Sequence, residues 1–197
     1  MPDIWIVRHA ATEWSASGRH TSVTDVSLTA EGRRAAAALA PLLARQPFEQ
    51  VLASPMRRSV ETARLAGFES PEIESDLCEW NYGELEGVTT PEIRSRGPEW
   101  SSWTVWRGPL PGGEAIDEVA ARARRVLERV DHGDGAVLIF SHGHFGRVFT
   151  AVALDLDPSC GAHFALDPAT VNIIGHEHEV RALRKWNATA SDSQESE

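Results

Sequence analysis

The sequence has almost no lysine, little cysteine and no long apolar segment. Lys185 is the only lysine, so the positive charge is carried by guanidinium groups, which suit phosphate recognition although a GC-rich genome explains the bias equally well. Cys78 and Cys160 lack metal-ligand spacing and are expected to be free thiols. No segment reaches the roughly 18 apolar residues of a membrane span. Because no secretory signal precedes residue 4 either, a cytoplasmic protein is expected.

Acidic residues outnumber basic ones, and the formal net charge is -10. That sign disfavours nucleic acid and anionic membranes as partners. A local group of arginine and histidine side chains can still bind a small anion, because close pairing outweighs a distant charge that salt screens. The sequence does not separate a monomer from a homodimer.

The 197 residues suffice for one well-packed core. The apolar pattern predicts strands and helices in alternation. The strands are expected at 4–7, 49–53, 71–75, 136–140, 170–176 and 179–185, and the helices at 30–45, 56–66, 114–130 and 144–154. This order predicts an α/β fold, a three-layer α/β/α sandwich with a mostly parallel central sheet. One domain is expected over 1–186, followed by a polar, disordered tail over 187–197.

Residues 76–113 interrupt this alternation. They are rich in Trp, Gly and Pro and show little periodicity beyond a short helix over 90–96. An irregular segment of that length in a compact domain is usually functional. Trp100, Trp103 and Trp106 are expected to cover the core there, and one of them is a candidate border of a ligand site.

Cationic side chains directly follow three of the expected strands. Arg8 and His9 follow the strand at 4–7, Arg57 and Arg58 follow the strand at 49–53, and His142 follows the strand at 136–140. Any one of these alone is better explained as a capped strand end. Open α/β sheets bind ligands outside the carboxyl ends of their strands. The three together therefore predict a phosphate site at this edge.

These residue types suit phosphoryl transfer, which needs a nucleophile, cations around the phosphoryl oxygens and an acid for the leaving group. Nearby arginines lower the pKa of an imidazole, so His9 is expected to be neutral and nucleophilic. The acid is expected in the segment 77–87, where a carboxyl group beside Trp80 and Tyr82 would have its pKa raised by desolvation.

The segment Arg8-His9-Ala10-Ala11-Thr12 resembles the R-H-G-x-T signature of the histidine phosphatase superfamily, whose fold is phosphoglycerate mutase-like. The resemblance continues in order at 21–29, 54–63, 79–87, 113–114 and 141–144. It is strongest to the branch of fungal sedoheptulose-bisphosphatases and actinobacterial acid phosphatases. It implies that His9 is phosphorylated, with Glu79 as proton donor and the remaining phosphate pocket made by Arg8, Arg58 and His142. It further implies these substrate-binding residues: Ser15, Thr21, Ser22, Tyr82, Gly143 and His144.

Two positions depart from the family pattern, and several roles stay open. Ala10 and Ser22 stand where glycine is usual, so the backbone at Ala10 must avoid positive φ or accept strain. His144 either binds substrate or caps the following helix. Glu84 and Glu86 are alternative proton donors.

Three further features have ordinary explanations beside functional ones. Arg19 and His20 either line the mouth of the site or belong to a plain loop. His176 and His178 share a strand face at i, i+2 spacing, where a solvated edge is favoured over a metal site. No metal or other cofactor is expected.

The resemblance implies a metal-independent phosphatase of small phosphorylated metabolites, such as sugar phosphates. A cofactor-dependent phosphoglycerate mutase is the first alternative. It is disfavoured because the cover at 88–113 contains no lysine and only three arginines, Arg94, Arg96 and Arg107. The second alternative is a catalytically inactive protein that binds a phosphorylated ligand. The presence of every expected catalytic group argues against it.

Overall fold

The computed structural model describes residues 1–190, and a six-stranded sheet runs through its centre in the order β3-β2-β4-β1-β5-β6. The strands are β1 (Ile4–Arg8), β2 (Phe48–Ala53), β3 (Glu72–Ile73), β4 (Ala136–Ser141), β5 (Val171–Glu177) and β6 (Val180–Ala188). Strands β1 to β4 pair in parallel, whereas β5 is antiparallel to both β1 and β6. The sheet is therefore mostly parallel.

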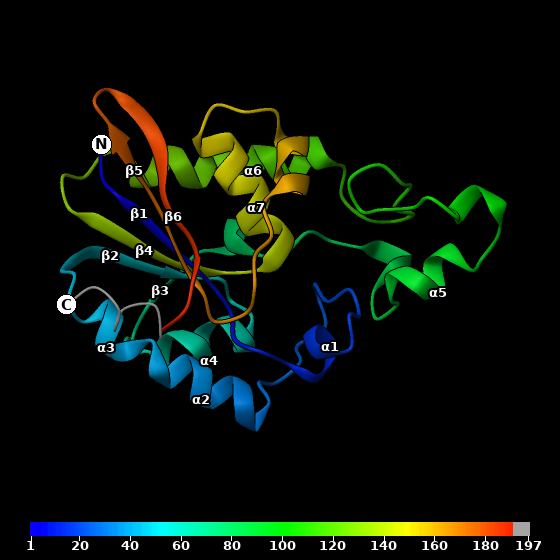
Figure 1. The fold of residues 1–197 in the computed structure, drawn as a ribbon, viewed down its shortest axis with the longest axis horizontal. Helices are drawn as coiled ribbons and strands as arrows, with labels where there is room; N and C mark the ends of the chain where they lie inside the picture. The colour runs from blue at the N-terminus through cyan, green and yellow to red at the C-terminus, as the bar shows by residue number, and fades with distance from the viewer. Residues whose placement is uncertain (191–197) are drawn as a thin grey trace.

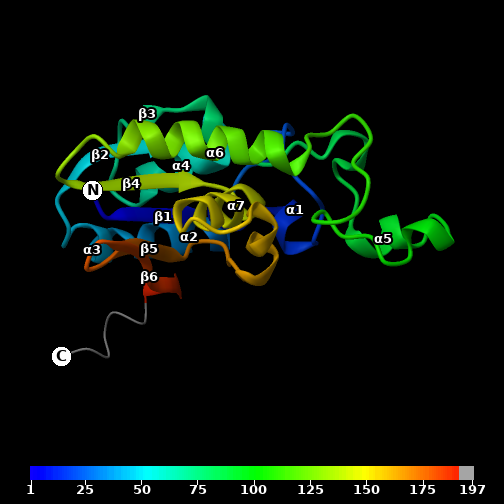
Figure 2. The ribbon, with the colours of Figure 1, turned by 90° about the horizontal axis from the view of Figure 1, so that it is seen from above.

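Helices cover both faces of this sheet (Figures 1 and 2). They are α1 (Glu13–Ala16), α2 (Ala30–Ala38), α3 (Ala40–Leu43), α4 (Arg57–Leu65), α5 (Thr90–Arg94), α6 (Ile116–Val130) and α7 (Gly143–Ala153). On β1, Ile4 and Ile6 join the core shared with α6 and α7, whereas Val7 joins the core shared with α2, α3 and α4. This period of two places α-helices on both sides and confirms the α/β/α sandwich.

Several boundaries differ from the expected ones; the strand predicted over 71–75, for example, is only Glu72–Ile73. The helix predicted over 30–45 is split into α2 and α3, because Pro41 near the start of α3 has no N–H to continue the hydrogen-bond ladder. Strand β6 extends to Ala188, two residues into the segment expected to be a tail. The backbone N–H of Asn187 donates to Oδ1 of Asn172 at 2.6 Å and holds this end in place. Of the rest of that expected tail, 189–190 follow the strand and 191–197 lie outside the described residues.

The irregular segment between β3 and α6 projects beyond the carboxyl ends of the parallel strands, on the side where α1 also lies (Figures 1 and 2). It contains α5 and short 3-10 helices at Ser75–Leu77, Gly83–Leu85 and Pro98–Trp100. Trp103 is buried in the core that the sheet shares with α6 and α7, and Trp100 and Trp106 pack against it. Among the described helices, none is long and apolar enough to cross a membrane.

Candidate active site

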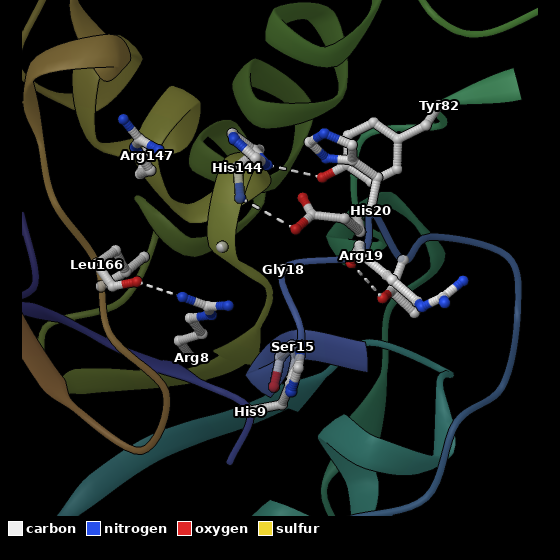
Figure 3. Close-up of a pocket in the computed structure, with 13 residues that line it drawn as sticks. Arg8, His9, Ser15, Gly18, Arg19, His20, Tyr82, His144, Arg147 and Leu166 are labelled. Carbon is white, nitrogen blue, oxygen red and sulfur yellow. Dashed lines mark hydrogen bonds between the residues drawn. The ribbon is translucent and has the colours of Figure 1, made fainter. Parts of the chain in front are cut away.

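A cavity of about 160 Å³ lies where the first and fourth strands end (Figure 3). It is lined by Arg8, His9, Ser15, Gly18, Arg19, His20, Thr21, Glu79, Tyr82, Gly143, His144, Arg147 and Leu166. Most of these side chains can donate or accept hydrogen bonds, so the cavity suits a small polar ligand.

The sheet register brings the three predicted strand ends together. Arg8 lies opposite Ser141 in the parallel pairing of β1 with β4. The backbone N–H of His9 donates to the carbonyl of Ser141 at 2.8 Å, and that of Ser54 donates to the carbonyl of Phe140 at 3.0 Å. The residues that follow β1, β2 and β4 are thus fixed relative to one another by backbone hydrogen bonds.

His9 is almost fully buried, and its Nδ1 lies 2.8 Å from the carbonyl oxygen of Ala10. Because a carbonyl can only accept, Nδ1 carries the hydrogen and the lone pair is on Nε2. Burial, followed by the charges of Arg58 and Arg8, holds the pKa of His9 well below its usual range. The ring is therefore neutral at neutral pH and able to act as a nucleophile.

Arg58, at the start of α4, is fully buried and holds a loop through its two terminal nitrogens. Nη1 donates to the carbonyl of Thr24 at 3.0 Å and Nη2 to that of Ser22 at 2.9 Å. Its Nε is buried with no partner among the described residues. Burial lowers the pKa of Arg58, but a guanidinium stays charged in proteins. Arg58 therefore supplies charge beside His9, and its Nε is a donor without a partner among the described residues.

Arg8 is arranged similarly on the other side of His9. Its Nη1 donates to the carbonyl of Leu166, and its Nε is buried without a partner in the described part of the chain. Burial lowers the pKa of Arg8, and the nearby charge of Glu79 raises it. A Cβ on Gly143 would lie 3.3 Å from Cζ of Arg8. Glycine at that position lets α7 begin directly against the guanidinium.

His142 precedes α7, and its ring centre lies 5.2 Å from that of His9. Its Nε2 is 2.8 Å from Oγ of Ser54, while Nδ1 is buried without a partner among residues 1–190. Burial and the charge of Arg58 hold the pKa of His142 well below its usual range. Arg58 and His142 do not line the open cavity. They lie next to His9, as the ring contact of His142 and the effect of the Arg58 charge on His9 show.

Glu79 lines the cavity, and its carboxylate accepts three backbone hydrogen bonds, two of them from the start of α7. The donors are the N–H groups of Trp80 at 2.9 Å, His144 at 3.0 Å and Phe145 at 2.7 Å. The sequence predicted an apolar setting beside Trp80 and Tyr82. The structure instead surrounds the carboxylate with backbone donors, which fix its position at the cavity.

The two alternative proton donors lie elsewhere. Glu84 is exposed, and neither Glu84 nor Glu86 lines the cavity. The carboxylate of Glu86 accepts from the backbone N–H groups of Ser22 and Thr24 and from the hydroxyl of Ser22. Glu86 therefore binds the N–H groups of the same loop whose carbonyl groups, those of Ser22 and Thr24, are bound by Arg58.

Ser15 and Thr21, two of the residues expected to bind substrate, line the cavity, but Ser22 does not. Both polar groups that Ser22 could offer a substrate, its N–H and its hydroxyl, are used by Glu86. Ala10 is not among the described residues with positive φ, so alanine stands in place of glycine there without backbone strain. Its N–H donates to Oγ1 of Thr62 at 3.0 Å.

Tyr82 and His144 form the wall opposite Arg8 (Figure 3), with the Tyr82 hydroxyl 2.7 Å from Nδ1 of His144. Burial raises the pKa of Tyr82 well above its usual range, and burial lowers that of His144 well below its own. The phenol therefore keeps its proton and the imidazole is neutral, so a single hydrogen bond joins the two side chains. The ring of His20 packs 4.8 Å from that of Tyr82.

Two further residues support this wall: Trp106, one of the three tryptophans considered as a border of the site, and Arg147, which the sequence did not single out. The ring of Trp106 lies 5.5 Å from that of His144, and the guanidinium of Arg147 lies 4.8 Å from the ring centre of Trp106. Arg147 also lines the cavity. The available signal was its position three residues after His144, which places both on one face of a helix.

The remaining candidates are placed as follows. Arg19 and His20 line the cavity and are therefore part of its mouth. His178 lies in the turn after β5 with φ of 53°, so it does not share a strand face with His176 as predicted. Within residues 1–190, no group of three or more His, Cys, Asp or Glu side chains is placed to hold a metal ion.

Comparison with known proteins agrees with this geometry. The model of the histidine phosphatase superfamily (branch 1) matches residues 4–189. The chain belongs to this superfamily. It is similar to an acid phosphatase of Mycobacterium tuberculosis, with 40% identity over 184 residues that cover 90% of this chain and 88% of the relative. It is also similar to sedoheptulose 1,7-bisphosphatase of Saccharomyces cerevisiae, with 29% identity over 181 residues that cover 77% and 67% of the two chains.

The fold of this histidine phosphatase also matches solved structures. The structure of an open reading frame product from Mycobacterium tuberculosis superposes with a TM-score of 0.89 and 38% sequence identity, covering 96% of this chain and 98% of that one. These matches confirm the superfamily that the resemblance implied and the fold that the alternation of strands and helices predicted.

Proposed function

We propose that this chain is a phosphatase of small phosphorylated metabolites that acts through a phosphohistidine on His9 and needs no metal ion. The observation that carries the proposal is the state of His9. Its ring is neutral, its Nδ1–H is bound to the Ala10 carbonyl, and its Nε2 lone pair lies beside Arg8 and Arg58. A nucleophile of this kind splits one difficult displacement into two easier ones.

In the first step, Nε2 of His9 attacks phosphorus and the bond from phosphorus to the ester oxygen breaks. The leaving alkoxide takes a proton from the Glu79 carboxyl group. Water then attacks the phosphohistidine, passes a proton back to Glu79, and inorganic phosphate leaves as the nitrogen–phosphorus bond breaks. Arg8, Arg58 and His142 stabilise the charge on the three equatorial oxygens in both steps.

The size and polarity of the cavity support a small substrate. About 160 Å³ holds a phosphoryl group and a few further atoms, and the walls offer arginine, histidine and hydroxyl groups to a polar leaving group. The similar proteins named acid phosphatase and sedoheptulose 1,7-bisphosphatase support the same class. Sugar phosphates are therefore the first substrates to test.

The cover over the cavity supports hydrolysis rather than mutase activity. Arg94 donates to the carbonyl of Trp103, Arg96 packs over the ring of Trp100, and neither they nor Arg107 line the cavity. The irregular segment 88–113 thus brings no cation to a second carboxylate or phosphate. A mutase has to hold such a group while its substrate reorients.

A turnover assay tests the proposal against its alternatives. Phosphate release from p-nitrophenyl phosphate, sugar phosphates and 3-phosphoglycerate is measured with and without EDTA and 2,3-bisphosphoglycerate. The proposal predicts release that EDTA leaves unchanged and that needs no bisphosphoglycerate. Loss in EDTA that magnesium or zinc restores contradicts metal-free catalysis. Interconversion of phosphoglycerates faster than hydrolysis indicates a mutase, and binding without turnover indicates an inactive ligand-binding protein.

A further inference from the structure

Ser54 is a buried residue that the proposed mechanism does not use, yet its hydroxyl touches a histidine of the site. It directly follows β2, and its Oγ lies 2.8 Å from Nε2 of His142. The backbone N–H of Ser54 donates to the carbonyl of Phe140, two residues before His142. The sheet therefore fixes the distance between this hydroxyl and the imidazole, and neither group can easily move away.

Two acceptors for the hydrogen of this hydroxyl lie nearby among the described residues. One is Nε2 of His142 at 2.8 Å, and the other is Sγ of Cys78 at 3.9 Å. Sulfur is a weak acceptor, whereas a bare imidazole nitrogen is a good one. The N–H of Met56 donates to Oγ of Ser54 at 3.4 Å and occupies one lone pair. The favoured arrangement has the Ser54 hydroxyl donating to Nε2.

The position of that hydrogen decides what the other ring nitrogen can do. His142 is fully buried, and burial together with Arg58 keeps its pKa low, so the ring holds one hydrogen. If Nε2 accepts from Ser54, the hydrogen of the ring is on Nδ1. Nδ1 is the nitrogen that has no partner among the described residues. With the hydrogen there it can donate to a phosphoryl oxygen at His9, whereas a bare lone pair would repel the same oxygen.

The geometry points to Ser54 as a positioning residue that holds His142 in the Nδ1–H form, so that a neutral histidine donates to the transferred phosphoryl group. This inference rests on the proposed function, since it assigns His142 to the phosphoryl group bound at His9. It places the second histidine under the same kind of control as His9, whose hydrogen is fixed by a carbonyl group. Ser54 itself touches no substrate atom.

The tautomer can be measured directly by ¹⁵N NMR on protein labelled at histidine, with the His142 signals assigned by their loss in His142→Asn. In the ligand-free wild type, Nδ1 of His142 is expected to be protonated and Nε2 unprotonated. In Ser54→Ala, the hydrogen is expected to move wholly or partly to Nε2. Orthovanadate, a phosphoryl analogue, is expected to bind the variant about tenfold more weakly, which is the loss of one hydrogen bond to a charged group.

Thr150→Val is the matched control, because it removes an equally buried hydroxyl that donates to the carbonyl of Gly146 within α7. It should lower stability and leave both the tautomer and orthovanadate binding unchanged. Protonation of Nε2 in the wild type overturns the inference, and so does an unchanged tautomer in Ser54→Ala. The protonation state of Nδ1 and Nε2 of His142 in the wild type still tests the inference if Ser54→Ala fails to fold. Failure to find a phosphohistidine would overturn the proposed function and leave the tautomer result intact.

Discussion

The two ends of the cavity are built in different ways. The proposed phosphate end consists of Arg8 and His9, which line the cavity, and of the buried Arg58 and His142 next to His9. All four lie at or after the ends of strands that backbone hydrogen bonds tie together. The outer wall consists of His20, Tyr82, His144 and Arg147, with Trp106 behind them, and is held by contacts between side chains. The sheet thus positions the residues proposed to act on the phosphoryl group. The irregular segment and α7 form the surroundings of the leaving group.

This difference suggests which end can change without loss of catalysis. A substitution in the outer wall alters packing around the leaving group, whereas one at the phosphate end removes a group that acts on every substrate. Substitutions at the phosphate end should therefore affect all phosphomonoesters alike. Substitutions in the outer wall should change kcat/KM by different amounts for substrates with different leaving groups.

Arg58→Lys is expected to be nearly as damaging as Arg58→Ala, with kcat/KM lowered at least about a hundredfold on every substrate. An ammonium has all its donors on one nitrogen, so it cannot reproduce the planar fork in which Nη1 and Nη2 hold the carbonyl groups of Thr24 and Ser22 while Nε stays free to donate. Arg57→Lys is the matched control, because that neighbouring side chain is mostly exposed. Near wild-type kcat/KM in Arg58→Lys would show that Arg58 acts only as a point charge.

Glu79→Gln is expected to show a defect that depends on the leaving group. A sugar alkoxide needs a proton as it leaves, so the loss there should be about 10²–10⁴-fold. Nitrophenolate can leave unprotonated, so p-nitrophenyl phosphate should suffer much less. The glutamine NH₂ also faces one of the three backbone N–H groups, which adds a smaller loss common to both substrates.

Steady-state kinetics on the two substrates, with exposed Glu84→Gln as the control, measure this difference. An equal loss on both would mean that Glu79 only shapes the start of α7. The proton donor would then have to be sought in another group.

Tyr82→Phe tests the outer wall. It removes the hydroxyl that is hydrogen-bonded to Nδ1 of His144, so the ring of His144 is no longer held in place beside the leaving group. The expected result is a loss of about tenfold in kcat/KM on sugar phosphates, the size of one hydrogen bond. Inhibition by orthovanadate should stay within about twofold of wild type. A comparable loss of orthovanadate binding would show that the wall and the phosphate end are not separable.

The buried histidines predict a pH dependence of stability. His9, His142 and His144 have pKa values lowered by burial below the ordinary 6.5. As pH falls below 6.5, the unfolded chain takes up protons that the folded chain does not. The free energy of unfolding therefore decreases below pH 6.5 and is unaffected by these groups above it. Each histidine should contribute about 1 kcal/mol between pH 6.5 and 5.5.

Urea unfolding of wild type and His144→Gln at pH 7.5, 6.5 and 5.5 measures that dependence. The variant should lose less stability than the wild type between pH 6.5 and 5.5. The same slope in both would show that His144 takes up its proton as readily in the folded state.

The phosphate end could be predicted from the sequence because short apolar runs followed by Arg or His identify strand ends, and parallel strands end at one edge. The wall could not. Arg147 has no local signal beyond its spacing from His144, and the approach of the Leu166 carbonyl to Arg8 spans 158 residues of sequence. Ser22 was expected to meet substrate, but its partner Glu86 lies 64 residues away. Such pairings depend on tertiary structure, which spacing along the chain does not encode.

The most direct test of the account is to trap the covalent intermediate. Wild type quenched in alkali during turnover, where phosphohistidine is stable, should carry one acid-labile phosphate, on Nε2 of His9. The His9→Ala variant should carry none and should retain less than about a hundredth of wild-type kcat, because removing a nucleophile costs at least that much. Phosphate on another residue, or a His9→Ala variant above that activity, would contradict the account.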